Sequence, residues 1–116
     1  MTELTKDDRV RKEILRIKKL LRELPEDRLK IADGIIRRAA FMQVTLEDLE
    51  DDIKVNGTTE NFSQARDIEY DRERPSVRIY NTLVKNYAAA MKQIVDMLPQ
   101  NDTAKKKDQL LEFLKR

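Results

Sequence analysis

The sequence predicts an all-α fold: a hairpin of two long helices, a central C-terminal helix and a short tail helix. Apolar residues in three separate segments recur at alternating intervals of three and four residues, the spacing of helices that pack in bundles. The helix breakers Pro25, Asn56-Gly57, Pro75 and Pro99 lie between these segments. The 116-residue chain is 40% charged and 5% aromatic, so its core must be small. We therefore expect one domain, residues 1–116, that completes its core in an oligomeric helical bundle.

The first two predicted helices cover residues 5–24 and 26–55 and form the hairpin. Thr5 is the candidate N-cap of the first helix. Its apolar seam consists of Val10, Ile14, Ile17, Leu21 and Leu24. The seam of the second helix consists of Ala32, Ile35, Ala39, Met42, Leu46, Leu49 and Ile53. This second helix either runs unbroken or breaks at Thr45, which forms a capping-box-like pattern with Asp48.

The remaining segments are a polar loop, a third helix and a tail. Residues 56–74 have no apolar periodicity and predict a loop that is either mobile or ordered by a partner. Pro75 opens a helix over residues 75–98, and residues 100–116 form a tail with a short helix. The predicted core or subunit contacts are Tyr80, Val84, Tyr87, Met91, Ile94 and Leu98. A second apolar row makes this helix apolar over much of its circumference, so we expect it at the centre of the assembly.

Charge is segregated along the chain, although its net charge is only +2. Residues 1–44 hold 12 basic and 8 acidic side chains, a net charge of +4. Residues 45–75 hold 4 and 10, a net charge of −6, and residues 76–116 hold 8 and 4, a net charge of +4. Segregated charge indicates oriented contacts between subunits or with a partner.

Basic side chains on the first helix repeat at the spacing of its apolar seam, but on another face. A helix of this basic density can follow a phosphate backbone and release counterions. The DNA-binding candidates are Arg9, Arg11, Lys12, Arg16, Lys19, Arg37 and Arg38. The alternative is a solvated face that carries ion pairs between helical neighbours. The acidic cluster within residues 47–52 is either a docking surface for a neighbour's basic residues or a solvated face.

Several function classes are excluded by composition. The chain has neither Cys nor His, which removes thiolate chemistry, disulfides, the usual metal ligands and the usual general base. Two glycines cannot build a Gly-rich phosphate loop, and no apolar run approaches the roughly 20 residues of a membrane span. Residues 39–53 do not fit a helix-turn-helix, because the would-be recognition helix is acidic. We therefore expect a soluble cytoplasmic protein with no catalytic residue, metal or cofactor, which is not an enzyme.

The third helix carries a family resemblance. The pattern is Pro75, then Ile-Tyr-Asn-Thr-Leu-Val-Lys-Asn-Tyr over residues 79–87, then Lys92-Gln93 and the closing Leu98-Pro99. It resembles the C-terminal helix of the small subunits of phage and prophage terminases, in particular those of phages of Gram-positive bacteria. The match is good over residues 75–99 and looser over residues 26–60, where the long helix and the Asn56-Gly57 turn fit the arrangement.

The resemblance implies a function. Small terminase subunits assemble into rings, bind double-stranded viral DNA in the host cytoplasm and regulate a large subunit that holds the ATPase and nuclease. It thus implies viral DNA, a terminase large subunit and further copies of this chain as partners. The tail, with its basic run at 105–107 and its apolar patch at 110–114, is the candidate surface for the large subunit. Two alternatives are a helical phage adaptor or morphogenesis protein that oligomerises without binding DNA, and a small dimeric DNA-binding regulator.

Overall fold

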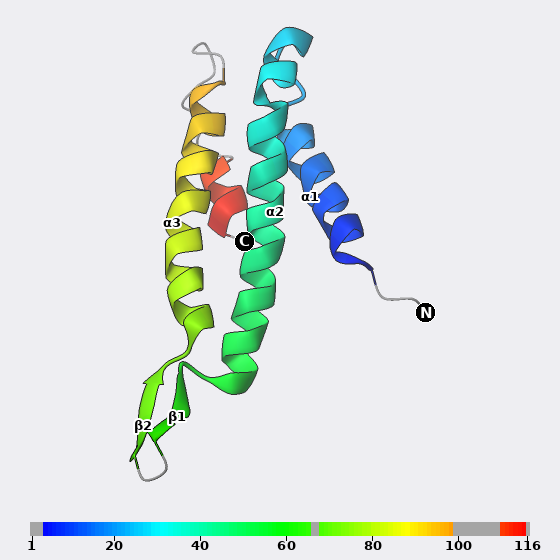
Figure 1. The fold of residues 1–116 in the computed structure, drawn as a ribbon. Coiled ribbons are helices and arrows are strands. Elements are labelled where there is room, and N and C mark those ends of the chain that lie inside the picture. The colour runs from blue at the N-terminus through cyan, green and yellow to red at the C-terminus, as the bar shows by residue number, and fades with distance from the viewer. Residues whose placement is uncertain (1–3, 66–67, 99–109, 116) are drawn as a thin grey trace.

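The computed structural model describes residues 4–65, 68–98 and 110–115 of a mostly helical chain with a small two-stranded sheet (Figure 1). The elements in order are α1 (Lys6–Leu20), α2 (Glu26–Asn56), β1 (Thr59–Ala65), β2 (Ile68–Glu73) and α3 (Pro75–Asp96). A short helix over residues 110–115 follows, and we call it the tail helix. The molecule is elongated, 65 × 36 × 23 Å, because α2 alone spans about 46 Å at 1.5 Å per residue.

Helix α1 begins where the capping pattern predicts. The Thr5 hydroxyl accepts a hydrogen bond from the Asp8 amide at 3.1 Å, and the Asp8 carboxylate accepts one from the Thr5 amide at 3.4 Å. This reciprocal pair satisfies two amides that have no partner within the helix. The helix ends at Leu20, four residues before the predicted end, and a turn leads to Pro25.

Helix α2 runs through Thr45 without a break, so the unbroken alternative is confirmed. It ends at Gly57, where φ is +79°, a backbone conformation that side chains with a Cβ rarely adopt. The Gly57 amide donates to the Ile53 carbonyl at 2.7 Å and closes the last turn. The glycine thus lets the chain leave the helix and enter β1 at once.

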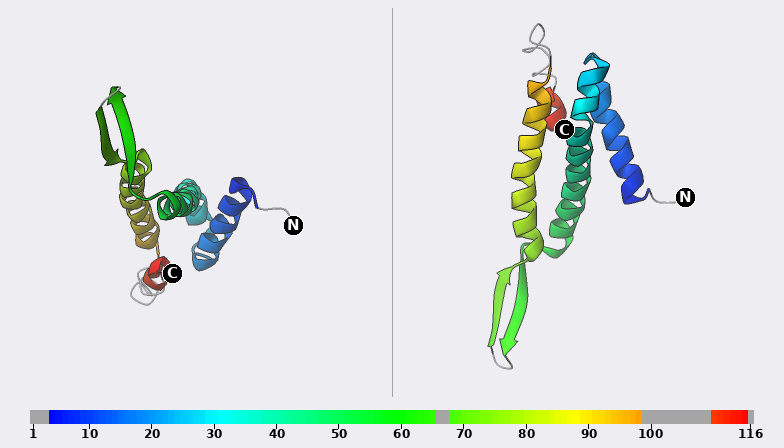
Figure 2. Two further views of the ribbon diagram at one scale, coloured as in Figure 1. Left: turned by 90° about the horizontal axis from the view of Figure 1, so that it is seen from below. Right: turned by 45° about the horizontal axis from the view of Figure 1, so that its top comes forward.

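The prediction of a polar loop over residues 56–74 is wrong, because β1 and β2 in this segment pair as an antiparallel β-hairpin. Side chains alternate between the two faces of a strand, and one face holds the cross-strand pairs Phe62–Tyr70 and Glu60–Arg72. The aromatic rings meet edge to face at 5.7 Å, and the Arg72 guanidinium lies 3.7 Å from the Phe62 ring centroid. The hairpin extends beyond the ends of α2 and α3 (Figures 1 and 2).

Helix α2 lies between α1 and α3 and packs against both (Figure 2). Two ion pairs set the antiparallel register with α1: Arg9 with Asp48 at 2.6 Å, and Lys18 with Asp33 at 3.2 Å. Within the single chain, the central helix is therefore α2 and not α3. A central place for α3 in an assembly remains a prediction.

The core lies where α1, α2, α3 and the tail helix converge. Its largest fully buried side chains are Ile17, Leu21, Ile36, Met91 and Ile94. Of the core or contact residues predicted for the third helix, Met91 and Ile94 of α3 and Leu98 just after it are buried, Tyr80 and Tyr87 are half-buried, and Val84 is 39% exposed. The predicted seam is thus buried in its C-terminal half and partly open in its N-terminal half.

Two isoleucines on α2 provide a matched test of this packing. Ile36 is fully buried and Ile31 is 73% exposed. Because Ile36→Ala leaves a cavity between helices, we expect it to lower the free energy of unfolding by about 2–5 kcal/mol. Ile31→Ala should change it by less than about 0.5 kcal/mol. Urea denaturation followed by circular dichroism measures both, and equal effects would contradict the placement of α2.

Candidate functional surfaces

Arg9, the first DNA candidate on α1, is held by the chain's own carboxylates. Its guanidinium donates to Asp48 at 2.6 Å and to Glu47 at 3.2 Å. The hydrogen bond to Asp48 is the main reason that the Arg9 pKa is raised above its usual value. Arg9 thus joins the start of α1 to the acidic end of α2.

Three further candidates pair with acidic neighbours on their own helices. Arg11 lies 3.6 Å from Asp8, and Arg37 donates to Asp33 at 2.7 Å. This hydrogen bond, with a second contribution from Lys18, lowers the Asp33 pKa. Arg16 donates twice to Glu13, at 2.8 Å each. The alternative of a solvated face with ion pairs between helical neighbours therefore fits Arg11 and Arg37, whereas the partner of Arg16 is a buried carboxylate.

The other three candidates are exposed. Lys12, Lys19 and Arg38 form no ion pair with any residue that the structure describes. Lys12 and Lys19 are seven residues apart on α1, so they share one face of the helix. Of the seven DNA-binding candidates, these three are therefore the ones without an ion-pair partner among the described residues.

The acidic cluster of α2 binds its own chain. Besides the contacts of Glu47 and Asp48 with Arg9, Asp52 pairs with Arg74 at 2.9 Å, and Glu50 accepts a hydrogen bond from the Tyr80 hydroxyl at 2.9 Å. Arg74 also donates to the Gly57 carbonyl at 3.1 Å, which ties the base of the hairpin together. Of the five carboxylates in the cluster, Asp51 has no partner among the described residues. The cluster therefore holds α1 and α3 of its own chain. The partners predicted for it from the sequence were only a neighbour's basic residues or solvent.

Helix α3 confines its charge to one row. Its charged residues are Arg78, Lys85, Lys92 and Asp96. Spacings of seven and four residues place these four on one face, away from α2. The flank on one side of the row consists of Pro75, Ile79, Thr82, Leu83, Asn86, Ala90 and Gln93, and the flank on the other side of Val77, Asn81, Val84, Ala88 and Val95. Both flanks are free of charge in a chain that is 40% charged.

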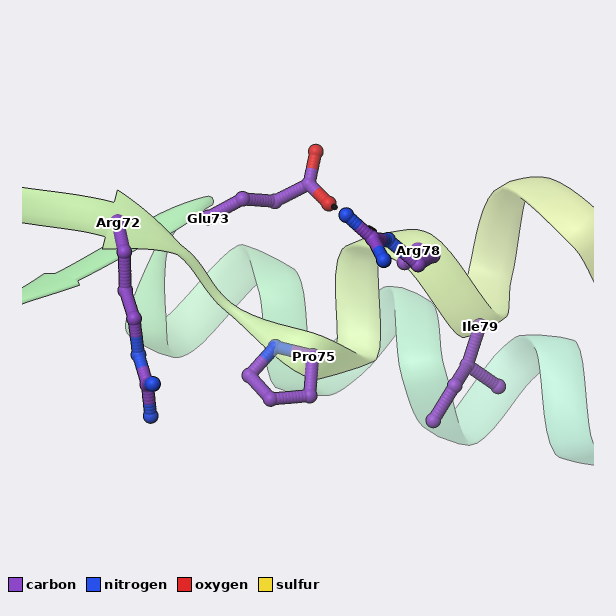
Figure 3. A pocket seen from close by; sticks show the side chains of 5 residues that line it. All are labelled: Arg72, Glu73, Pro75, Arg78 and Ile79. Carbon is purple, nitrogen blue, oxygen red and sulfur yellow. Dashed lines mark ion pairs between the residues drawn. The ribbon is translucent and has the colours of Figure 1, made fainter.

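Shallow grooves follow the first of these flanks. One, of about 410 Å³, lies where the hairpin meets α3 and is lined by Arg72, Glu73, Pro75, Arg78 and Ile79 (Figure 3). A second, of about 270 Å³, continues along α3 and is lined by Arg78, Ile79, Thr82, Leu83 and Asn86. Ile79, shared by both, is 55% exposed. The flank itself is uncharged here, and charged side chains border the grooves: Arg78 borders both, and Arg72 and Glu73 border the first.

The tail helix is only partly the exposed patch that was expected. Leu110 is buried in the core, and the Phe113 ring lies under the Arg16 guanidinium, whereas Leu111 and Leu114 are exposed. The basic run 105–107 lies outside the described residues. Within the parts of the chain that are described, no three acidic side chains are placed to hold a metal ion, and no helix is long and apolar enough to cross a membrane.

The Arg74–Asp52 pair predicts a pH dependence. The hydrogen bond from Arg74 lowers the Asp52 pKa, so the pair stabilises the fold above the ordinary aspartate pKa of about 4 and loses this effect as the pH falls. In Arg74→Gln the Asp52 pKa, followed by NMR, should rise towards its ordinary value. The loss of stability in this variant should be larger at pH 7 than below pH 4, since at low pH Asp52 is protonated in both proteins. An unchanged Asp52 pKa would contradict the pairing.

Comparisons with known proteins identify no relative. No protein-family model matches the chain, and no curated protein or solved structure is significantly similar to it. The function must therefore be argued from the surfaces described above and from the pattern of residues 75–99.

Proposed function

We propose that this chain is a non-catalytic, self-assembling small subunit of a viral DNA-packaging terminase. In this role it binds double-stranded viral DNA and regulates a large ATPase and nuclease subunit in the host cytoplasm. The observation that carries the proposal is the pair of uncharged flanks on α3, which supports packing against further copies. The terminase assignment itself rests on the resemblance over residues 75–99.

Two uncharged flanks suit a helix that has a neighbour on each side. The cores of protein interfaces are depleted in charged residues, and α3 presents exposed Ile79 on one flank and Val84 on the other. If one flank of α3 packs against a different surface of the next copy, the contact is heterologous, and repeating it forms a ring when the rotation between copies closes. The charged row of Arg78, Lys85 and Lys92 would stay in solvent. The half-open N-terminal part of the predicted seam would then be completed by neighbouring copies.

Repetition also compensates for the small basic surface of one copy. Lys12, Lys19 and Arg38 can contact only a few phosphates, which gives one chain weak DNA affinity. In a ring, several copies present these side chains to one duplex. Once one copy has bound, the other copies meet the DNA at a high effective concentration. DNA binding by this chain should therefore depend on assembly.

A second candidate function is an oligomeric adaptor or morphogenesis protein that does not bind DNA. The observation in its favour is that Arg9, Arg11, Arg16 and Arg37 already pair with carboxylates of their own chain. Phosphates would have to compete with these carboxylates. The two functions share the proposed assembly and differ in the affinity for duplex DNA at low salt.

Placing a charge on a flank of α3 tests the assembly. We expect Val84→Glu to reduce the native mass measured by light scattering, because it would bury a carboxylate between copies. The matched control is Lys85→Glu, which alters charge on the solvent-facing row of the same helix and should leave the mass unchanged. If both variants retain the native mass of the parent chain, the flank that contains Val84 is not the interface.

The salt dependence of DNA binding separates the two functions. We expect Lys12→Ala with Lys19→Ala to weaken duplex binding and to flatten the plot of log affinity against log salt, by about one unit of slope for each lost phosphate contact per copy. The control pair Arg11→Ala with Arg37→Ala removes arginines that already have partners and should have a smaller effect. Absence of duplex binding by the unaltered chain at low salt would favour the adaptor.

A further inference from the structure

The tail helix docks on a surface between α1 and α3, which we call the seat. Leu110 is 2% exposed and belongs to the same core cluster as Ile17 of α1, Leu21 just after α1, and Met91 and Ile94 of α3. Figure 2 shows the tail helix beside α3, on the side that faces α1. The floor of the seat is thus apolar, and α2 contributes to the same core cluster with Ala32, Ile36, Ala39 and Ala40.

A partly buried ion pair forms the rim of the seat. The Glu13 side chain is only 10% exposed and accepts both hydrogen bonds from Arg16, whose guanidinium lies 3.7 Å from the Phe113 ring centroid. Nearby, burial and then the charge of Glu13 raise the pKa of Tyr87 to about 12, so its hydroxyl stays protonated. Phe113 therefore covers a charged pair and stacks on its cation, a favourable arrangement for an aromatic ring.

The opposite side of the tail helix is open. Leu111 is 53% exposed, and Leu114 is also exposed. The described residues of the tail helix contact the seat through Leu110 and Phe113. The seat thus already binds a helix, and it does so through two side chains three positions apart.

We propose that this seat is a helix-binding groove and that the tail helix is its resident, displaceable occupant. The partner that fits is an amphipathic helix with a large aliphatic side chain and, three positions later, an aromatic one on the same face. Such a helix would insert the aliphatic group among Ile17, Leu21, Met91 and Ile94 and place its ring on Arg16. Docking of the tail helix therefore inhibits binding of the partner. This inference depends neither on DNA binding nor on assembly.

The test uses the full-length chain and a fluorescent synthetic peptide of residues 105–116. Leu110→Asp should release the tail helix, because a carboxylate cannot enter the apolar floor, and the peptide should then bind at least tenfold more tightly than to the unaltered chain. Leu111→Asp is the matched control and should bind the peptide as weakly as the unaltered chain does. A peptide that itself carries the Leu110→Asp change should bind to none of them. Fluorescence anisotropy measures the affinities, and amide hydrogen exchange reports on residues 110–115 and on α1–α3.

Two results would overturn the proposal. One is failure of the peptide to bind Leu110→Asp when hydrogen exchange finds the tail released and α1–α3 protected. The other is equal peptide binding by the unaltered chain and both variants, which would place the peptide elsewhere. If Leu110→Asp loses protection in α1–α3, Phe113→Ser takes its place, because it removes only the ring on Arg16. It should raise the peptide affinity by a smaller factor, and no increase would contradict the groove.

Discussion

The two-sided burial of α2 is the constraint on which the rest of the structure depends. Ala32, Ile36, Ala39 and Ala40 are completely buried, so α2 requires α1 on one side and α3 on the other. The small side chains of the three alanines allow the neighbouring helices to approach closely. Because α3 must pack against α2, the chain has to reverse its direction after α2 ends. The β-hairpin makes that reversal possible, and Gly57 begins it.

Several charged side chains of this chain make contacts between its own helices. The carboxylates near the end of α2 hold Arg9, Arg74 and the Tyr80 hydroxyl, and these contacts join α2 to the first turns of α1 and α3. Individually, such partly exposed pairs contribute little to stability, about 1 kcal/mol or less. Together they determine which register the helices adopt, and they leave only a small set of exposed cations for a partner. The basic surface of a single copy is therefore smaller than the composition suggests.

Apolar periodicity predicted the helices, because a long segment at 3.5-residue spacing has few other ways to bury its apolar side chains. The hairpin was not predicted, since its strands carry only a few apolar residues, such as Phe62 and Tyr70, among charged ones. The alternation of these residues with polar ones was the available signal. The partners of Arg9 could not be predicted, because they lie 38 and 39 residues away along the chain. The buried face of the tail helix could not be predicted either, because it is set by packing against α1 and α3.

The central claim is that the uncharged flanks of α3 are covered by further copies of the chain. It is tested most directly by the native mass of the unaltered protein, measured by native mass spectrometry and light scattering over a range of concentrations at physiological salt. The proposed function predicts a single discrete oligomer larger than a dimer whose subunit number does not change with concentration, as expected for a closed ring. A monomer or a dimer at every concentration would contradict it and would leave the flanks of α3 to some other partner.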